Sequence, residues 1–338
     1  MEKSAELAPR RPLAKSREYI SKRLLKIIVL IVIVVVIVLL PPALGVHQAA
    51  YYQAVLIGGV LTGGVYVLIA TGLTLIMGVM KIVNICHGDF VILAAYLSFW
   101  MDKIYGLDPI LSVVISIPLL FAAGIPIQRL LFSRGLKLGV DTSLIVAFGL
   151  SNILQYSMVT AWGVDARIAS TSYSTSVLSV GPVLVPVMRL VVLGVAALCV
   201  IVVTIFLKKT YLGMAVRATG MDWEIASHFG IDTERVNMLA YSIGLSLAAV
   251  AGALISLVLG FTSSSGVPLM LKGFAAIVLG GVGSVPGALV GGIILGYAES
   301  TGSFFLGSEY TNLIGFSIFF VVLLLRPWGL LGRRESSQ

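Results

Sequence analysis

The sequence predicts an all-α, polytopic membrane protein with about eight full spans and one split pair of half-helices. Hydrophobic residues make up 58% of the 338 positions. Charged residues make up only 11%, whereas an average soluble protein carries about 25%. The charges cluster in short segments between apolar runs of about 20 residues, the length a helix needs to cross a hydrocarbon core of ~30 Å. This pattern excludes a soluble globular, a disordered and a nucleic-acid-binding protein.

The first predicted element is a basic arm, residues 1–26, which leads into an apolar run over Leu24–Leu40. This pairing is also typical of a signal peptide. However, the flank is about 26 residues long, and Pro41-Pro42 stands where a small-residue cleavage site would be expected. We therefore expect an uncleaved first span.

The remaining elements follow from the other apolar runs. Seven more runs are long enough to span, namely Ala54–Met80, Ile82–Met101, Pro109–Phe132, Thr142–Trp162, Val183–Leu207, Val236–Gly260 and Phe304–Leu325. The stretch Val267–Ser300 is apolar but interrupted by GGVGSVPG at 280–287. We expect it to form two short half-helices that enter from one side and return. The Ser- and Thr-rich residues 163–182 are the longest external connection, either a solvated loop or a docking surface.

The placement of Lys and Arg predicts the orientation, since short cytoplasmic loops carry an excess of both. If the N-terminus is cytoplasmic, 19 of the 23 Lys and Arg residues lie inside. The four exceptions are Lys103, Arg167, Arg189 and Lys272. We expect a cytoplasmic arm at 1–26, a transmembrane domain at 27–325 with an inner loop at 208–235, and a cytoplasmic tail at 326–338. Both termini are then cytoplasmic.

Polar residues inside the third run are candidates for a translocation gate. If Lys81 marks the inner interface, His87 and Asp89 lie ~9 and ~12 Å deeper by helical rise. An unpaired charge near mid-membrane costs about 2.5–3.5 kcal/mol on insertion scales, so these side chains need partners or water. Either Asn84 caps the helix while the other two hydrogen-bond within the bundle, or all three form a polar gate with a hinge at Gly88.

Glycine spacing is a second indication of where the translocation path lies. Most of the 36 glycines are expected to serve helix packing, because small residues let helix backbones approach closely. Paired, glycine-interrupted helices also mark transport paths, and Leu56–Gly78 and Gly273–Gly296 are the candidates. The expected path residues therefore include Gly280, Gly281 and Gly283. No sequence pattern indicates a catalytic or a metal site.

The inner loop 208–235 predicts a short amphipathic helix over Met221–Phe229. Asp222 is suited to cap its start and Gly230 to end it in the left-handed conformation. Ile225, Ala226 and Phe229 are expected on one side. Such a helix is either a membrane-surface anchor or a docking site, and its mixed charge disfavours the anchor.

At this loop the sequence resembles a known family. The segment GMAVRATGMDWEIASHFGIDTERVNMLAYSIGLSLAAVAG, at Gly213–Gly252, is similar to the coupling loop and following helix of high-affinity branched-chain amino acid ABC transporter permeases. Three further segments match in order: GLTLIMGVMKIVNICHGDF, GFAAIVLGGVGSVPGALVGGIILGYAES and RPWGLLGRRE. The resemblance covers roughly residues 50–335. The long arm at 1–26, and Ser227 in place of a second alanine, depart from the family pattern.

The resemblance implies a non-enzymatic, translocating subunit of an importer in the bacterial inner membrane. Its implied partners are a second homologous permease, two ATPase subunits and a periplasmic binding protein. ATP and Mg would lie on the ATPase subunits, with no cofactor in this chain, and the sequence contains no G-x-x-x-x-G-K-[ST] phosphate loop. The expected ATPase-coupling residues are Asp222, Trp223, Glu224, Ile225, Ala226, Phe229, Gly230 and Ile231.

Two alternatives stay open at this point. A secondary transporter or facilitator would work without ATPase subunits, and it would have no need of a docking helix in loop 208–235. A structural subunit without a path of its own would not need the split segment. Within the importer class, relatives are associated with branched-chain amino acids but also with urea, short amides and aromatic acids, so the substrate is not fixed.

Overall fold

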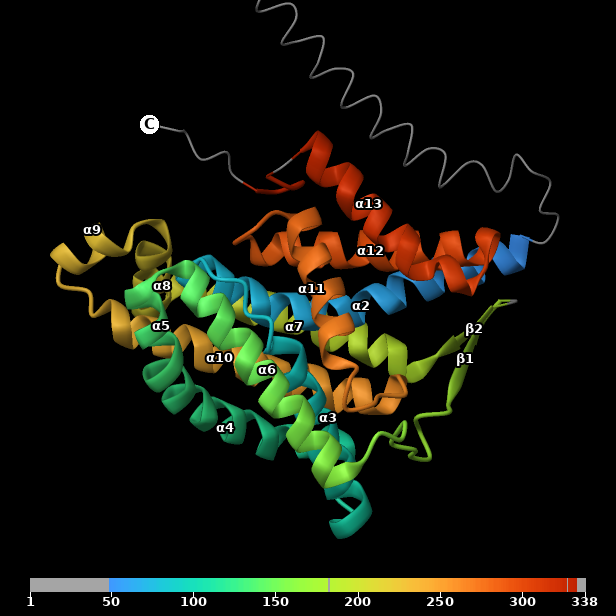
Figure 1. Cartoon of the computed structure of the whole chain (residues 1–338). Helices are drawn as coiled ribbons and strands as arrows, with labels where there is room; N and C mark the ends of the chain where they lie inside the picture. The colour runs from blue at the N-terminus through green and yellow to red at the C-terminus, as the bar shows by residue number, and fades with distance from the viewer. Residues whose placement is uncertain (1–48, 182, 327, 333–338) are drawn as a thin grey trace, which may run out of the picture. The chain divides into compact units, whose positions relative to one another are not determined.

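The computed structural model describes residues 49–181, 183–326 and 328–332, which form a helical bundle (Figure 1). The expected basic arm, the first span at Leu24–Leu40 and the tail residues 333–338 lie outside the described residues. The helices are α2 (Ala49–Met80), α3 (His87–Tyr105), α4 (Pro109–Ile127), α5 (Ser133–Leu138), α6 (Val140–Trp162), α7 (Val187–Lys209), α8 (Tyr211–Met221), α9 (Trp223–His228), α10 (Thr233–Val258), α11 (Gly266–Gly280), α12 (Val285–Leu306) and α13 (Thr311–Leu325).

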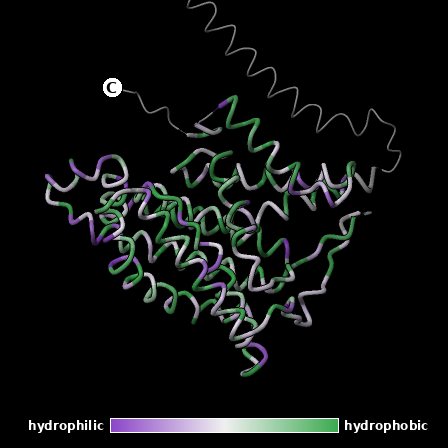
Figure 2. Tube along the Cα trace, in the orientation of Figure 1, coloured by the Kyte–Doolittle hydropathy of each residue, from purple (hydrophilic) through white to green (hydrophobic). Residues whose placement is uncertain are grey.

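The predicted fold class is confirmed. Within the described ranges, seven helices are long and apolar enough to cross a membrane: Gln53–Met80, Pro109–Leu136, Asp141–Trp162, Val187–Lys209, Thr233–Val258, Val285–Leu306 and Ser308–Leu325. A five-residue π-helix, Gln128–Phe132, continues α4 into α5. Figure 2 shows apolar residues along the helices and hydrophilic ones around α9 and the last turn of α3.

Helix α2 forms the centre of the bundle and packs against α7, α10, α11 and α12. Its contact with α12 depends on glycine. A β-carbon on Gly63 would lie 2.7 Å from the Ile293 Cα atom, and one on Gly292 would lie 2.6 Å from a Val67 methyl group. The two backbones therefore touch without intervening side chains, as expected for small residues between membrane helices.

The split segment differs from the prediction. Helix α11 is short, with 15 residues, but α12 has 22 residues and is long enough to cross a membrane. Pro286 does not break α12, because it stands in the first turn, where its missing N–H costs nothing. Ser284 caps this start by accepting a hydrogen bond from the Gly287 N–H at 3.1 Å.

The turn between α11 and α12 lies at the end of the bundle rather than halfway through it. A β-carbon on Gly78, in the last turn of α2, would lie 3.5 Å from the Gly283 Cα atom. Residues 328–332 cover the turn from another side, since the Leu331 N–H donates to the Gly280 carbonyl at 2.8 Å. We call this end, where α2, α8 and residues 328–332 meet, the α9 end.

The opposite end carries the connection between α6 and α7. Residues 163–182 were expected as one long loop, but they include strand β1 (Val177–Val180), which pairs antiparallel with β2 (Val183–Pro186). The Tyr173 hydroxyl donates to both carboxylate oxygens of Asp108 at 2.6 Å. Burial and this hydrogen bond raise the pKa of Tyr173 to about 12, so it stays a donor at neutral pH.

Candidate functional site

Helix α9 is a short helix with a cap at each end, as the sequence predicted. It begins at Trp223, two residues later than expected, because the extended backbone of Asp222 places that residue at the N-cap. The Asp222 carboxylate accepts a hydrogen bond from the Ile225 N–H at 2.9 Å. Gly230 follows the helix with φ +81°, the left-handed conformation that favours glycine. The two caps hold a helix of six residues, which has little intrinsic stability by itself.

The apolar residues of α9 divide between two surroundings. Ile225 and Phe229 are 56% and 83% exposed, and Trp223 is 58% exposed. Ala226, which was predicted to lie with them, is instead only 4% exposed. Ile231 packs against the buried cluster of Leu75, Val79, Ala215, Val216, Val236 and Ala240. Three large apolar side chains therefore project outward from a base fixed by smaller ones.

The third predicted span, Ile82–Met101, is not among the helices long and apolar enough to cross a membrane, and its helix begins later than expected. Helix α2 ends at Met80, Lys81 takes a left-handed conformation with φ +54°, and helix resumes only at His87. Asn84 is not the helix cap, because Cys86 occupies that position without a side-chain cap bond. The Asn84 side chain instead accepts a hydrogen bond from the Cys86 thiol at 2.8 Å. The depths estimated from continuous helical rise therefore do not apply.

The candidate gate residues are fully buried. Asn84, His87 and Asp89 have no exposed surface. The Asp89 carboxylate accepts a hydrogen bond from the Ser151 hydroxyl of α6. The His87 ring packs so closely on α2 that a β-carbon on Gly72 would lie 2.9 Å from its Cε1 atom. The three side chains are packed within the bundle in this conformation, although neither His87 ring nitrogen has a hydrogen-bond partner among the described residues. Both the hydrogen-bonded packing role and the gate stay predictions.

The remaining path candidates lie at the other end of α11. Gly88 packs against the Gly266 backbone at the start of α11. Gly280, Gly281 and Gly283 lie at its end, about 22 Å away by the rise of 15 residues. Gly281 and Gly283 have φ of 110° and 77°, so the turn itself requires glycine. The structure does not bring the two sets of predicted path residues together.

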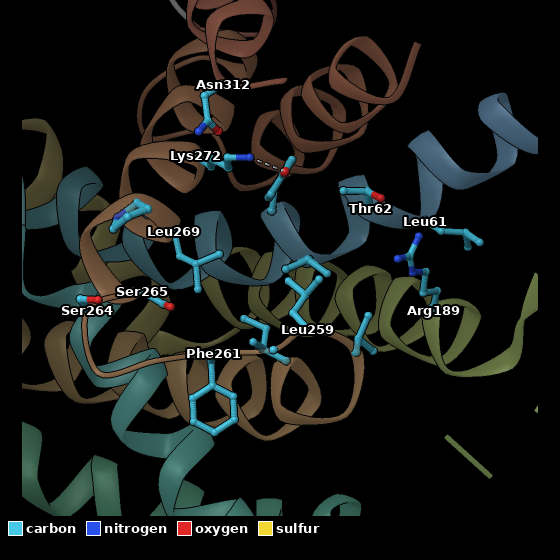
Figure 3. Close-up of a pocket in the computed structure, with 16 residues that line it drawn as sticks. Leu61, Thr62, Arg189, Leu259, Phe261, Ser264, Ser265, Leu269, Lys272 and Asn312 are labelled. Carbon is cyan, nitrogen blue, oxygen red and sulfur yellow. Dashed lines mark hydrogen bonds between the residues drawn. The ribbon is translucent and has the colours of Figure 1, made fainter. Parts of the chain in front are cut away.

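A cavity of about 420 Å³, which no sequence pattern indicated, lies between α2, α7, α10, α11 and α13 (Figure 3). Its apolar wall includes side chains from α2, α10 and the segment 259–265. Its polar lining comprises Thr62, Tyr66, Arg189, Ser264, Ser265, Lys272 and Asn312. The known size range of small-molecule sites, about 300–1,000 Å³, includes this volume.

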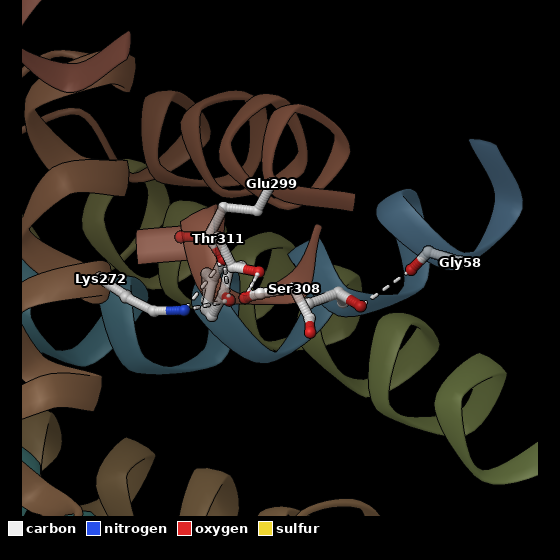
Figure 4. A network of polar contacts seen from close by, with 7 residues as sticks. Gly58, Lys272, Glu299, Ser308 and Thr311 are labelled. Atoms are coloured by element: carbon white, nitrogen blue, oxygen red, sulfur yellow. Dashed lines mark hydrogen bonds and ion pairs between the residues drawn. The ribbon is translucent and has the colours of Figure 1, made fainter. Parts of the chain in front are cut away.

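A buried ion pair lies at one side of this cavity and joins three helices (Figure 4). The Lys272 ammonium on α11 lies 3.0 Å from the Glu299 carboxylate on α12. The Tyr66 hydroxyl on α2 donates to the same carboxylate oxygen at 2.5 Å and accepts from Lys272 at 3.1 Å. The Lys272 and Glu299 side chains are 18% and 4% exposed. The sequence did contain a signal for this ion pair, since Lys272 and Glu299 are opposite charges in consecutive apolar segments. Charges within membrane segments usually pair with one another.

The second cation of the cavity is Arg189, the third residue of α7. Figure 3 shows its side chain extending from α7 toward Leu61 and Thr62. Among the residues that the structure describes, no carboxylate forms an ion pair with it. The same part of the chain contains no cluster of His, Cys, Asp or Glu that could hold a metal ion.

Comparison with known proteins agrees with this architecture. A family profile described as the branched-chain amino acid transport system permease component matches residues 55–323. The high-affinity branched-chain amino acid transport system permease protein LivH of Escherichia coli K12 is 34% identical over 312 residues, which cover 86% of this chain and 99% of the relative. The corresponding protein BraD of Pseudomonas aeruginosa is 31% identical over 302 residues, or 85% and 98%.

A more distant relative matches only in part. The autoinducer 2 import system permease protein LsrC of Salmonella paratyphi B is 36% identical over 101 residues, which cover 28% of this chain and 29% of LsrC. No solved structure matches the chain. The full-length matches and the profile, which runs from α2 to α13, agree with the resemblance noted in the sequence. The chain is therefore a member of the family of permease components of branched-chain amino acid transport systems.

Proposed function

We propose that this chain is the translocating subunit of an ATP-driven importer for branched-chain or related amino acids. The family membership supports transport. The sequence supports a separate energy source, because it contains no phosphate-binding loop of the G-x-x-x-x-G-K-[ST] type. Two ATPase subunits would bind at the α9 end and would carry ATP and Mg. A second homologous permease would complete the membrane part, and a periplasmic binding protein would deliver the substrate at the opposite end.

The observation that carries this proposal is the exposed apolar surface of α9. Trp223, Ile225 and Phe229 are each more than half exposed on a helix capped at both ends. Apolar side chains held rigidly outside the bundle match the central, fully desolvated anchors of protein interfaces. The mixed charge of the surrounding loop, with Asp222 and Glu224, disfavours an anchor on anionic lipid.

The basic residues at the α9 end support an orientation of the chain in the membrane. At the α9 end, Lys81 follows α2, Lys208 and Lys209 end α7, and Arg235 lies in the first turn of α10. Because short cytoplasmic segments carry an excess of Lys and Arg, this end would face the cytoplasm of a bacterial inner membrane. ATP binding and hydrolysis on the attached subunits would then displace α9 and rock the bundle between outward-open and inward-open states.

The test is copurification of ATPase subunits with matched aromatic variants. Phe229→Ala removes an 83% exposed ring at α9, and Tyr105→Ala removes an 80% exposed ring at the far end of α3. We expect the Phe229 variant to lose ATPase subunits at least tenfold and the Tyr105 variant to retain them. Full retention by both variants would contradict the docking assignment. Amino-acid uptake into ATP-free proteoliposomes that contain only this chain would favour a facilitator.

A further inference from the structure

The cavity beside the Lys272–Glu299 pair has the walls of a site for a small amphipathic ligand. Val258 of α10, Leu259 and Leu269 of α11 are partly exposed and contribute apolar surface to it. At about 420 Å³ it lies in the lower part of the range for small-molecule sites. Its seven polar residues come from α2, α7, α11, α13 and the segment before α11, so they reach a ligand from several directions and can orient it.

Irregular backbone lines the same cavity. Leu259, Gly260 and Phe261 follow the end of α10 and precede α11 without regular helix. This segment does not lie beyond the bundle, since the neighbouring Ser263 hydroxyl is 2.9 Å from the Tyr96 hydroxyl, nine residues before the end of α3. Non-helical backbone at membrane depth is tolerated where it is buried in protein or lines an aqueous cavity.

The two cations that line the cavity, Lys272 and Arg189, differ in whether they can pair with a charged ligand. Lys272 is already compensated by the Glu299 carboxylate and the Tyr66 hydroxyl. Arg189 is partly buried and forms no ion pair within the described part of the chain. A planar guanidinium presents two parallel N–H donors, which match the two oxygens of a carboxylate. The cavity therefore offers one cation, Arg189, that is free to bind a ligand carboxylate and lies next to apolar surface.

We propose that this cavity binds an aliphatic amino acid on its way through the bundle, with Arg189 as the partner of the α-carboxylate. The aliphatic side chain lies against Val258, Leu259 and Leu269. The proposal rests on the proposed transport function and adds the substrate contact to it. The site lies away from the α9 end, on the side where the binding protein would release its cargo.

Protection of an engineered thiol tests the site directly. Ser264 is exposed and lines the cavity, so Ser264→Cys in a Cys199→Ser background places a thiol at its wall. Cys86 is fully buried and will react slowly. The rate of maleimide labelling is measured on the purified full chain with L-leucine and with L-leucinamide, which lacks the carboxylate. We expect L-leucine to slow labelling at least threefold and L-leucinamide to have no effect.

Two charge variants complete the design. With Arg189→Gln the protection by L-leucine should disappear, whereas with Lys103→Gln, whose side chain is 49% exposed at the far end of α3, it should persist. Equal protection in the Arg189 variant, equal protection by L-leucinamide, or no protection in any variant would overturn the proposed site.

Uptake measurements separate this proposal from the importer proposal. In the assembled transporter, Arg189→Gln should lower L-leucine uptake at least tenfold while ATPase activity stimulated by the loaded binding protein is retained. Normal ATP-driven uptake by this variant would overturn the Arg189 contact and leave the importer proposal standing. Absence of ATP-driven uptake by the unmodified chain would instead contradict the proposed function, whatever the labelling shows.

Discussion

The Lys272–Glu299 ion pair makes a quantitative prediction about stability. The two charged atoms are 3.0 Å apart, and the side chains are only 18% and 4% exposed. Burying both charges costs much of the free energy that their attraction returns, so the pair as a whole contributes little net stability. Removing one partner is different, because it leaves an uncompensated charge on a side chain that is largely buried.

We therefore expect Lys272→Met and Glu299→Gln each to lower the free energy of unfolding by about 2–4 kcal/mol. The double variant should lose at least about 2 kcal/mol less than the sum of the two single losses, since neither charge is then left alone. The measurement is equilibrium unfolding of the full chain in mixed detergent–lipid micelles, with all four proteins titrated under the same conditions.

The control is the pair between Asp102 and Lys103, whose charged atoms are 3.6 Å apart and whose side chains are 19% and 49% exposed. Exposed pairs contribute about 0–1 kcal/mol, so Lys103→Met should change stability by no more than that. If the losses at Lys272 and Glu299 add within about 0.5 kcal/mol, the two side chains do not interact in the folded protein and the reasoning fails.

Three further predictions address packing, the gate and topology. Gly63→Val should lower thermal stability strongly, since a β-carbon there meets the α12 backbone, whereas Gly194→Val, where a β-carbon meets nothing within 4 Å, should be near neutral in the same assay. Asp89→Asn should reduce uptake while the Ser151 hydrogen bond, and with it assembly, is kept; unchanged uptake would assign Asp89 to packing alone. Val282→Cys, at a site 50% exposed, should react with impermeant reagents only from the cytoplasmic side in oriented vesicles, and labelling from outside would reverse the proposed orientation.

Local signals in the sequence predicted local structure well. Asp222 and Gly230 were identified as caps from residue type and position, and both hold these roles. Capping works through bonds within a few residues, so it can be read without knowing what else is near. The long apolar spans were predictable for the same reason, because bilayer thickness sets their length.

Features that depend on tertiary contacts were not predictable in this way. Tyr66 and Glu299 are 233 residues apart in sequence, and no local pattern brings their side chains together. The break before His87 was missed because Lys81–Cys86 is mostly apolar and continues the run in hydropathy, although its backbone is not helical. The split segment was misjudged because Pro286 starts helices as readily as it ends them.

The helices around the cavity also connect it to the α9 end. Gly220, in the last turn of α8, packs against the Gly78 carbonyl of α2, and the α11–α12 turn packs against the same residue through Gly283. From that turn α11 continues to Lys272, eight residues and about 12 Å away. Helix α12 leads from the turn to Glu299. A displacement of α9 and α8 therefore acts on the point where the two helices that carry the ion pair join.

Contact along this route is a condition for coupling but does not establish it, because coupling requires an element with two arrangements that both sites bias. The turn with Gly281 and Gly283 is the candidate element, since its positive φ angles of 110° and 77° leave little alternative to glycine. Gly283→Ala should raise the strain of this turn by about 1 kcal/mol and shift the balance between its arrangements. In the protein with Gly283 intact, we expect binding of the ATPase subunits to change how strongly L-leucine protects the Ser264→Cys thiol. In the Gly283→Ala variant, we expect ATPase binding to leave this protection unchanged. An identical response in both proteins would show that the signal from α9 does not pass through this turn.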